Sequence, residues 1–230
     1  VSPGFNPKVV DWCIAHDVTV APGINSPTQL EMALERGLNT VKFFPAEASG
    51  GLEMLKAMAA PYGGVKFMPT GGISQANLAS YLAYDRILAC GGSWMVKGDL
   101  IAAGKFDEIV KLVRQAVAAV HGFEVVRVGI EAESIEGANE VGQRIARLFL
   151  WPLAESADSL FAGDAIQIAK GRSSSGSVRV TIAANSLKRA VSYLKRQGVE
   201  VTSDTASGHG DKARSVDLKV PGVSFTLVQR

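Results

Sequence analysis

The sequence is poor in cysteine, in net charge and in long apolar runs. Its two cysteines, Cys13 and Cys90, lie far apart, so we interpret them as free thiols of a reducing compartment rather than as a disulfide framework. The formal net charge of +2 gives no electrostatic reason to expect a nucleic acid or an anionic membrane as partner. No apolar run is long enough to span a bilayer, and no signal peptide opens the chain. These absences predict a folded cytoplasmic protein with no nucleic-acid and no membrane partner.

A nucleotide-binding glycine pattern is also absent, which bears on the fold of the first half. Short apolar segments alternate with helical patterns, and we expect strands at 1–2, 19–21, 40–44, 65–68 and 87–90. Such an alternation is typical of a parallel sheet, in either a (β/α)8 barrel or a doubly wound open sheet. No G-x-G-x-x-G follows a strand, while glycines crowd "PTGGIS" (69–74) and "CGGSW" (90–94), where a barrel holds phosphate. We therefore predict an α/β fold of the TIM-barrel type.

The number of strands indicates that this barrel is incomplete. Only about five strands can be counted, whereas a barrel needs eight. The chain opens with "VSPGF" at Val1, a stretch that resembles the end of a strand entering a turn. We therefore expect residues 1–121 to be the second half of a barrel, strands 4–8, whose earlier strands lie outside the sequence.

After His121 the pattern changes to an internal duplication. Residues 123–170 and 177–230 each read as a strand, a helix and further strands, in the order β-α-β-β-β. The polar, glycine-containing stretch "KGRSSSGS" (170–177) joins the two modules. We predict two domains, 1–121 and 122–230.

One lysine, Lys42, stands inside the apolar strand segment "TVKFF" (40–44). Burying a charged ammonium is costly, so such a lysine is either paired with a carboxylate, extended past the strand end, or used chemically. A neutral lysine amine is a nucleophile toward a carbonyl group. Because glycine-rich segments that suit phosphate follow the next strands, the combination favours an aldolase acting on a phosphorylated keto acid or sugar.

Three motifs, in this order and spacing, carry a resemblance to a known family. They are "VKFFPAEASGG", "FMPTGGIS" and "CGGSWMV", and "VSPGF" and "APGI" fit the ends of earlier strands. Together they closely resemble the 2-keto-3-deoxy-6-phosphogluconate (KDPG) aldolases, which also act as 4-hydroxy-2-oxoglutarate (KHG) aldolases, over residues 1 to about 120. The resemblance implies a class I aldolase of the barrel fold, a homotrimer that uses no metal and no other cofactor.

The resemblance also implies roles for particular residues. Lys42 would form the Schiff base with pyruvate or the keto acid, Phe44 would line the pocket beside it, and Thr70 would contact substrate oxygens. The phosphate site would comprise Gly71, Gly72 and Ser93, where backbone N–H groups and a hydroxyl suit an anion.

Each of these residues also has a purely structural interpretation. The two glycines can serve a tight strand-to-helix turn, Ser74 a helix N-cap and Ser93 a cap on the next short helix. Glu47 can be a helix-start acid, and we expect no catalytic role for it. The family's general-base glutamate and its carboxylate-binding arginine and threonine belong to the strands that are missing here. The chain therefore has the nucleophile without its proton-transfer partner, which normally contributes roughly 10²–10⁴-fold in rate.

The two β-α-β-β-β modules resemble the glyoxalase-like, vicinal-oxygen-chelate superfamily in architecture, over residues 123–230. Active members bind a divalent metal through His and Glu side chains. Here the matching positions hold Arg127, Ser177 and Arg179, and the region's one histidine, His209, lies in "SGHGD". We expect no metal site, and a structural or regulatory role for this domain.

Three functions compete on this evidence. The favoured one is a lyase that cleaves a phosphorylated 2-keto-3-deoxy sugar acid into pyruvate and an aldehyde through an imine on Lys42. The second is a non-catalytic binding or assembly protein, in which a degenerate half-barrel presents the glyoxalase-like domain. The third is an isomerase or epimerase on a related phosphate-binding barrel, which has no use for a strand-borne lysine.

Overall fold

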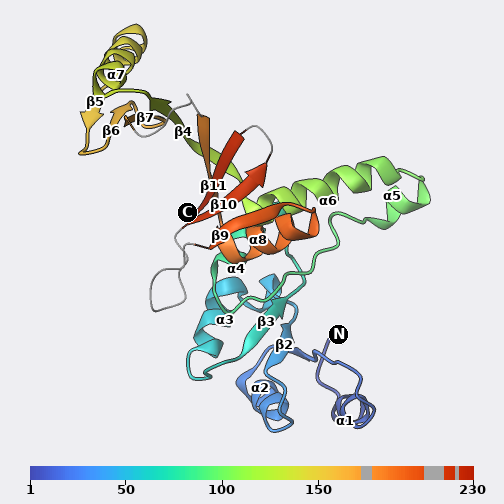
Figure 1. The fold of residues 1–230 in the computed structure, drawn as a ribbon. Helices are drawn as coiled ribbons and strands as arrows, with labels where there is room; N and C mark the ends of the chain where they lie inside the picture. Colours follow the sequence, from blue (N-terminus) through green and yellow to red (C-terminus); the bar gives the residue numbers. More distant parts are fainter. Residues whose placement is uncertain (172–177, 205–214, 221–222) are drawn as a thin grey trace. The chain divides into compact units, whose positions relative to one another are not determined.

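The computed structural model describes residues 1–171, 178–204, 215–220 and 223–230. The predicted linker 170–177 falls mostly in a gap, and Ser177 and His209 lie outside the described residues. The chain divides into two units, Val1–Val120 and His121–Arg230. Each unit has helices and a sheet of its own (Figure 1), so the protein is of the mixed α/β type.

Unit 1 alternates helices with short parallel strands. Its elements are α1 (Pro7–Ala15), β1 (Gly23–Ile24), α2 (Pro27–Leu34), β2 (Thr40–Phe43), the 3-10 helix η1 (Glu47–Ser49), α3 (Gly51–Ala59), β3 (Lys66–Pro69), α4 (Gln75–Ala83), α5 (Gly98–Ala102) and α6 (Phe106–His121). Proline begins α1 and α2, where its missing N–H costs nothing. The side chains of Asn6 and Ser26 accept backbone hydrogen bonds at these two helix starts.

The sheet of unit 1 has three strands in the order β1-β2-β3, all parallel. One face of this sheet packs against the helices, and its fully buried side chains include Val41, Phe43 and Phe67. The facing helix residues include Leu30 of α2, Leu55 of α3, and Leu78 and Tyr81 of α4. This apolar layer fixes which side chains of the strands point away from the helices.

Several strand predictions for unit 1 were wrong. Residues 1–2 and 19–21 lie outside strands, and the strand expected at 87–90 is reduced to two isolated bridges, Phe67 with Ile87 and Thr70 with Gly91. Pro22 has no N–H to donate, so pairing in the first segment starts only at Gly23, although the Pro22 carbonyl accepts from the N–H of Lys42. The sheet is therefore shorter than the five-stranded half-barrel that we expected.

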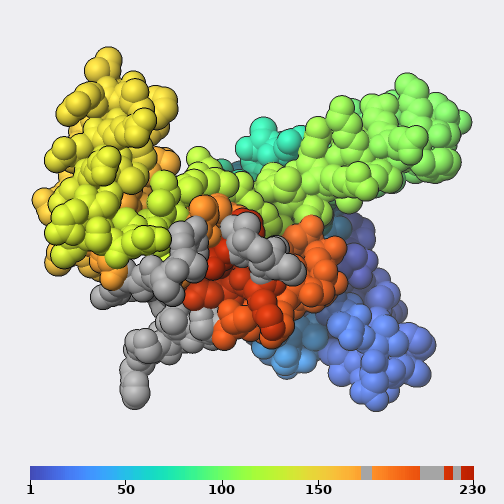
Figure 2. Space-filling model, turned by 45° about the horizontal axis from the view of Figure 1, so that its top comes forward, coloured from blue at the N-terminus to red at the C-terminus, as the bar shows by residue number. Residues whose placement is uncertain are grey.

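The long helix α6 has apolar residues on one side, as its periodicity predicts, but part of that side is open. Ala116 is buried in the core of unit 1, whereas Phe106, Val110 and Val113 are exposed. Figure 2 shows the surface of this helix, drawn in green, open on the face in view. No helix among the described residues is both long and apolar enough to cross a membrane.

Unit 2 contains two segments, each with the order β-α-β-β-β. The first comprises β4 (Glu124–Ala132), α7 (Ile135–Phe149), β5 (Leu153–Glu155), β6 (Ser159–Ala162) and β7 (Ile166–Lys170). The second comprises β8 (Val178–Ala184), α8 (Leu187–Arg196), β9 (Glu200–Asp204), β10 (Ser215–Val220) and β11 (Val223–Gln229). Ser134 and Ser186 cap the two helices, each accepting a hydrogen bond from a backbone N–H.

The strands of unit 2 form one eight-stranded sheet in the order β5-β6-β7-β4-β8-β11-β10-β9. Its central pair joins the first strands of the two segments, β4 and β8, in antiparallel fashion, and each of these is parallel to the last strand of its own segment. The strand order therefore reads the same from either edge, as expected of a duplicated module.

Candidate functional site

The candidate site lies on the face of the unit 1 sheet that points away from the helices. Successive side chains of a strand point to opposite faces. Since Val41 and Phe43 are buried against the helices, Lys42 between them points to the other face. Lys42 pairs with Met68 of β3, so Met68 and Thr70 share this face with it.

The amine of Lys42 lies beside an aromatic ring from its own segment. Its Nζ is 4.5 Å from the ring centroid of Phe44, two residues further along and on the same face. The side chain is only half-buried. The carboxylate partner considered from the sequence is not found for Lys42 among the salt bridges of the described residues. The lysine thus meets an apolar ring, and its amine is within reach of a ligand.

Thr70 follows directly after β3 and is a diagonal neighbour of Lys42 on the same face. Its Oγ1 is buried and, within the described ranges, has no hydrogen-bond partner. Buried hydroxyls without a partner are uncommon in folded proteins. This hydroxyl is therefore available to a ligand oxygen placed above Lys42.

Gly71 and Gly72 form a turn that only glycine adopts easily. Their φ angles are +89° and +86°, a region that L side chains rarely occupy. A Cβ on Gly71 would lie 3.1 Å from the ring of Phe44, and a Cβ on Gly72 would lie 2.5 Å from Cγ of Glu47. The backbone of the turn is therefore in close contact with the segment that follows Lys42, at Phe44 and Glu47.

Glu47 has a structural contact that the sequence did not reveal. Its Oε1 accepts a hydrogen bond from the hydroxyl of Tyr81, which is 2% exposed, and its N–H donates to the carbonyl of Gly71 at 3.0 Å. Burial, together with the Glu47 carboxylate, raises the pKa of Tyr81, so the phenol remains a donor. We therefore interpret Glu47 and Tyr81 as a clamp that holds the turn.

Ser93 and Ser74 occupy different surroundings at the same end of the sheet. The bridge between Thr70 and Gly91 brings the segment that carries Ser93 next to the glycine turn, and Ser93 itself is exposed. Ser74 is the N-cap of α4 and forms a capping box with Asn77. The glycine turn, the start of α4 and the segment of Ser93 are thus neighbours.

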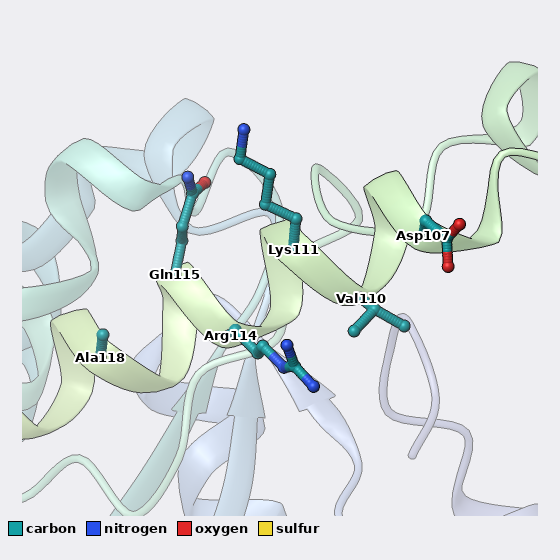
Figure 3. A pocket seen from close by; sticks show the side chains of 6 residues that line it. All are labelled: Asp107, Val110, Lys111, Arg114, Gln115 and Ala118. Carbon is teal, nitrogen blue, oxygen red and sulfur yellow. The ribbon is translucent and has the colours of Figure 1, made fainter.

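A hollow of about 500 Å³ lies elsewhere, along α6. Its lining comes from one helix and consists of Asp107, Val110, Lys111, Arg114, Gln115 and Ala118. Figure 3 shows Lys111 and Gln115 rising on one side of the helix, while Val110 and Arg114 point to the other. With walls from a single helix, this hollow lacks the converging polar groups of a ligand site.

We expected Lys42, Phe44, Thr70 and the two glycines to lie in one site from the sequence. The hydrogen bond between Tyr81 and Glu47 was not expected. The spacing of Glu47 and Tyr81, 34 residues apart, carries no local signal. Among the residues that the structure describes, no three His, Cys, Asp or Glu side chains are grouped so that they could hold a metal ion.

The comparison with known proteins concerns the segment that carries this geometry. Residues 1–112 match the family model of the KDPG and KHG aldolases. This chain is 55% identical over 120 residues to a 2-dehydro-3-deoxy-phosphogluconate aldolase of Treponema pallidum, covering 52% of this chain and 57% of that protein. It is 50% identical over 117 residues to the Haemophilus influenzae protein of the same name, covering 51% and 55%.

A solved structure is similar over about half of this chain. It is the KDPG aldolase of Legionella pneumophila with pyruvate captured as a covalent carbinolamine, which is 36% identical, with a TM-score of 0.47, covering 48% of this chain and 53% of that one. The chain spans about half the length of the curated relatives that it matches.

Proposed function

We propose that residues 1–112, which match the family model, are part of a class I aldolase in which Lys42 forms an imine with a 2-keto acid. The observation that carries the proposal is the position of Lys42 on the helix-free face, diagonal to the partnerless hydroxyl of Thr70, which the turn of Gly71 and Gly72 follows directly. The matched relatives bear the name of an aldolase that acts on a 2-dehydro-3-deoxy-phosphogluconate. The substrate class is accordingly a phosphorylated 2-keto-3-deoxy sugar acid, with KHG as a second candidate.

The proposed reaction uses each residue in a defined way. The Nζ of Lys42 attacks the C2 carbonyl, water leaves and an imine forms. The bond between C3 and C4 then breaks, its electron pair enters the imine to give an enamine, and the C4 hydroxyl loses its proton as the aldehyde forms. Protonation at C3 and hydrolysis release pyruvate and restore the amine. The hydroxyl of Thr70 would hold a substrate oxygen during these steps.

The phosphate of the substrate would bind at the glycine turn. Backbone N–H groups of consecutive residues near the start of a helix suit an anion. Gly71 and Gly72 precede α4, and the segment of Ser93 lies beside them. We assign Phe44 to the wall beside the amine, and Gly71, Gly72 and Ser93 to the phosphate.

We propose that the general base and the remaining subunits of the enzyme lie outside this chain. Glu47 is engaged by Tyr81 and the glycine turn, so we give it no role as a base. The general base would come from the strands of the first half of the barrel. The complete assembly would be a cytoplasmic homotrimer. Unit 2 would be a glyoxalase-like domain without a catalytic metal. The alternative is that the chain is a non-catalytic assembly protein.

The test is reductive trapping on the 230-residue chain. After incubation with pyruvate and borohydride, we expect the adduct on Lys42 by mass spectrometry. Lys66 is the matched control, because it lies on the same face at the other end of β3 and its Nζ donates to the carbonyl of Asp85 at 3.0 Å. Lys42→Arg should abolish the adduct, since a guanidinium does not form the imine, and Lys66→Arg should not.

Two outcomes separate the candidate functions. An adduct spread over Lys56 and Lys66, with Lys42 unmodified, would overturn the assignment and favour the assembly protein. Pyruvate release from the keto acid should be negligible for the chain alone and should rise when the unmatched part of the Treponema pallidum relative is added. Robust turnover by the chain alone would show that a residue within it, such as Glu47, is the base.

A further inference from the structure

The long helix α6 has two apolar sides, and the core of unit 1 covers only one of them. Ala116 is buried in that core, and Ala119 and Val120 pack against it. A second row of apolar side chains, which we call the α6 stripe, follows the helix at positions i, i+4, i+7 and i+11 and consists of Phe106, Val110, Val113 and Val117. The first three members of the stripe are 61%, 47% and 38% exposed. The packing of unit 1 therefore leaves the stripe uncovered.

The spacing of the α6 stripe is that of a coiled-coil seam. Successive steps of four, three and four residues place its side chains along one line of the helix, where a second helix packs knobs into holes. Contiguous exposed apolar side chains of this kind mark interaction sites. The stripe therefore fits an apolar row on another helix.

Two side chains of opposite charge border the α6 stripe on one flank. Asp107 and Arg114 are seven residues apart, so they lie on the same side of the helix, and both are exposed. Figure 3 shows Arg114 on the same side of α6 as Val110. In the described part of the chain, neither charge takes part in an ion pair. Both also line the hollow along α6, whose walls come from this one helix, so a partner helix can lie against it.

We propose that the α6 stripe is a dimer contact, in which α6 of a second copy of this chain packs against it in antiparallel direction. The two-fold axis passes between Val110 and Val113, so Val110 faces Val113 of the second copy. Phe106 then faces Val117 of the second copy. A two-fold contact repeats every pair, so Asp107 lies beside Arg114 of the second copy at both ends of the seam.

The charges decide the direction of the two helices. In a parallel pair, the flank of one helix meets the opposite flank of the other. The opposite flank of α6 carries Ile109 and Ala116, so Asp107 and Arg114 would have no ionic partner there. In an antiparallel pair the like flanks meet, and this flank carries one charge of each sign. The sequence of α6 is therefore complementary to itself only in the antiparallel arrangement.

The contact is small and independent of the proposed reaction. It involves one helix from each copy, which places it at the low end of interface sizes, below about 1,200 Å². We therefore expect a dimer that dissociates on dilution. Neither Lys42 nor the glycine turn takes part, so a failure of the dimer would leave the proposed aldolase chemistry untouched.

The experiment is sedimentation equilibrium of the whole chain over a wide concentration range. Val110→Ser and Val113→Ser should each raise the Kd of the dimer at least about tenfold, because each removes apolar burial from both copies. Val9→Ser is the matched control: Val9 lies on α1 and is 49% exposed, against 47% for Val110. It should change Kd less than about twofold.

Charge reversal tests the flank. Asp107→Arg places cations side by side and should weaken the dimer about tenfold, and combining it with Arg114→Asp should bring Kd back to within about threefold of the wild type, because the ion pairs re-form with reversed sign. Glu108→Arg makes the same change of charge at an exposed position that faces away from the stripe. This control should change Kd less than about twofold.

Cysteine variants test the direction. A mixture of Phe106→Cys and Val117→Cys should form a disulfide between the two variants, since these positions face each other in the antiparallel pair. Each variant alone should not cross-link, because its two thiols would lie roughly 16 Å apart along the helix axis. Mass spectrometry of the linked peptides distinguishes these disulfides from any at Cys13 or Cys90. Cross-linking of each variant with itself, and not of the mixture, would exclude the antiparallel contact.

The proposal fails if the chain is a monomer at every concentration, or if Val9→Ser weakens the dimer as much as Val110→Ser does. The competing occupant of the α6 stripe is the unmatched part of the Treponema pallidum relative. A monomer whose α6 is protected from hydrogen exchange only after that part is added would overturn the dimer and assign the stripe to that segment.

Discussion

Gly72→Ala is expected to destabilise unit 1 by about 2–5 kcal/mol, through two separable effects. The first is backbone strain, because Gly72 has a φ of +86°, and a left-handed backbone costs an L residue about 1–2 kcal/mol. The second is crowding, because a Cβ would lie 2.5 Å from Cγ and 2.6 Å from Cβ of Glu47. Overlap in a packed region typically costs about 1–3 kcal/mol.

A second glycine isolates the first effect. Gly37 has a φ of +73°, yet nothing lies within 4 Å of a Cβ built on it. Gly37→Ala should therefore show the strain alone, about 1–2 kcal/mol. Gly63→Ala is the control without either effect, since its φ is not left-handed and its surroundings are open.

The assay is urea unfolding, followed by hydrogen exchange of the peptides that cover residues 65–84. The difference between Gly72→Ala and Gly37→Ala measures the crowding by Glu47. In a Glu47→Gly background, which lacks the Cβ and Cγ that collide, Gly72→Ala should cost little more than Gly37→Ala does. Equal losses for the two alanine variants, within about 0.5 kcal/mol, would refute the close approach of the turn to Glu47.

Two further predictions concern buried titratable groups. Tyr81→Phe keeps the buried ring and removes the hydroxyl that donates to Glu47, so unfolding in urea should show a loss of about 1–2 kcal/mol, and an unchanged midpoint would contradict the clamp. His121 is 6% exposed, and burial, with the charges of Arg196 and Arg189, lowers its pKa. The unfolded chain therefore binds more protons than the folded one below about pH 6.5, so unit 2 should lose stability as the pH falls through that range. The urea midpoint of His121→Phe should vary less between pH 7.5 and 5.5 than that of the wild type, and parallel pH profiles would exclude His121 as the cause.

The local pattern of the sequence determined much of the candidate site. Alternation along "TVKFF" predicts that Lys42 and Phe44 share a face, and the glycines of "PTGGIS" predict a tight turn after the next strand. Both features depend on neighbours within a few residues, where side-chain period and backbone freedom act directly. The prediction of strands at 1–2 and 19–21 was wrong. A strand also needs a partner with free backbone groups, and a local sequence pattern carries no information about that partner.

Only the tertiary structure decided which groups from distant segments meet. The pairing of β2 with β3 made Thr70 a diagonal neighbour of Lys42, and the packing of α4 brought Tyr81 to Glu47. In unit 2, the bulged register between β4 and β8 set which residues of the two first strands lie opposite each other. A shift of one residue in that register would turn every side chain of a strand to the opposite face. Register depends on contacts across about fifty residues, so the pairing of β4 with β8 followed from the fold, whereas the lysine on its strand followed from the sequence.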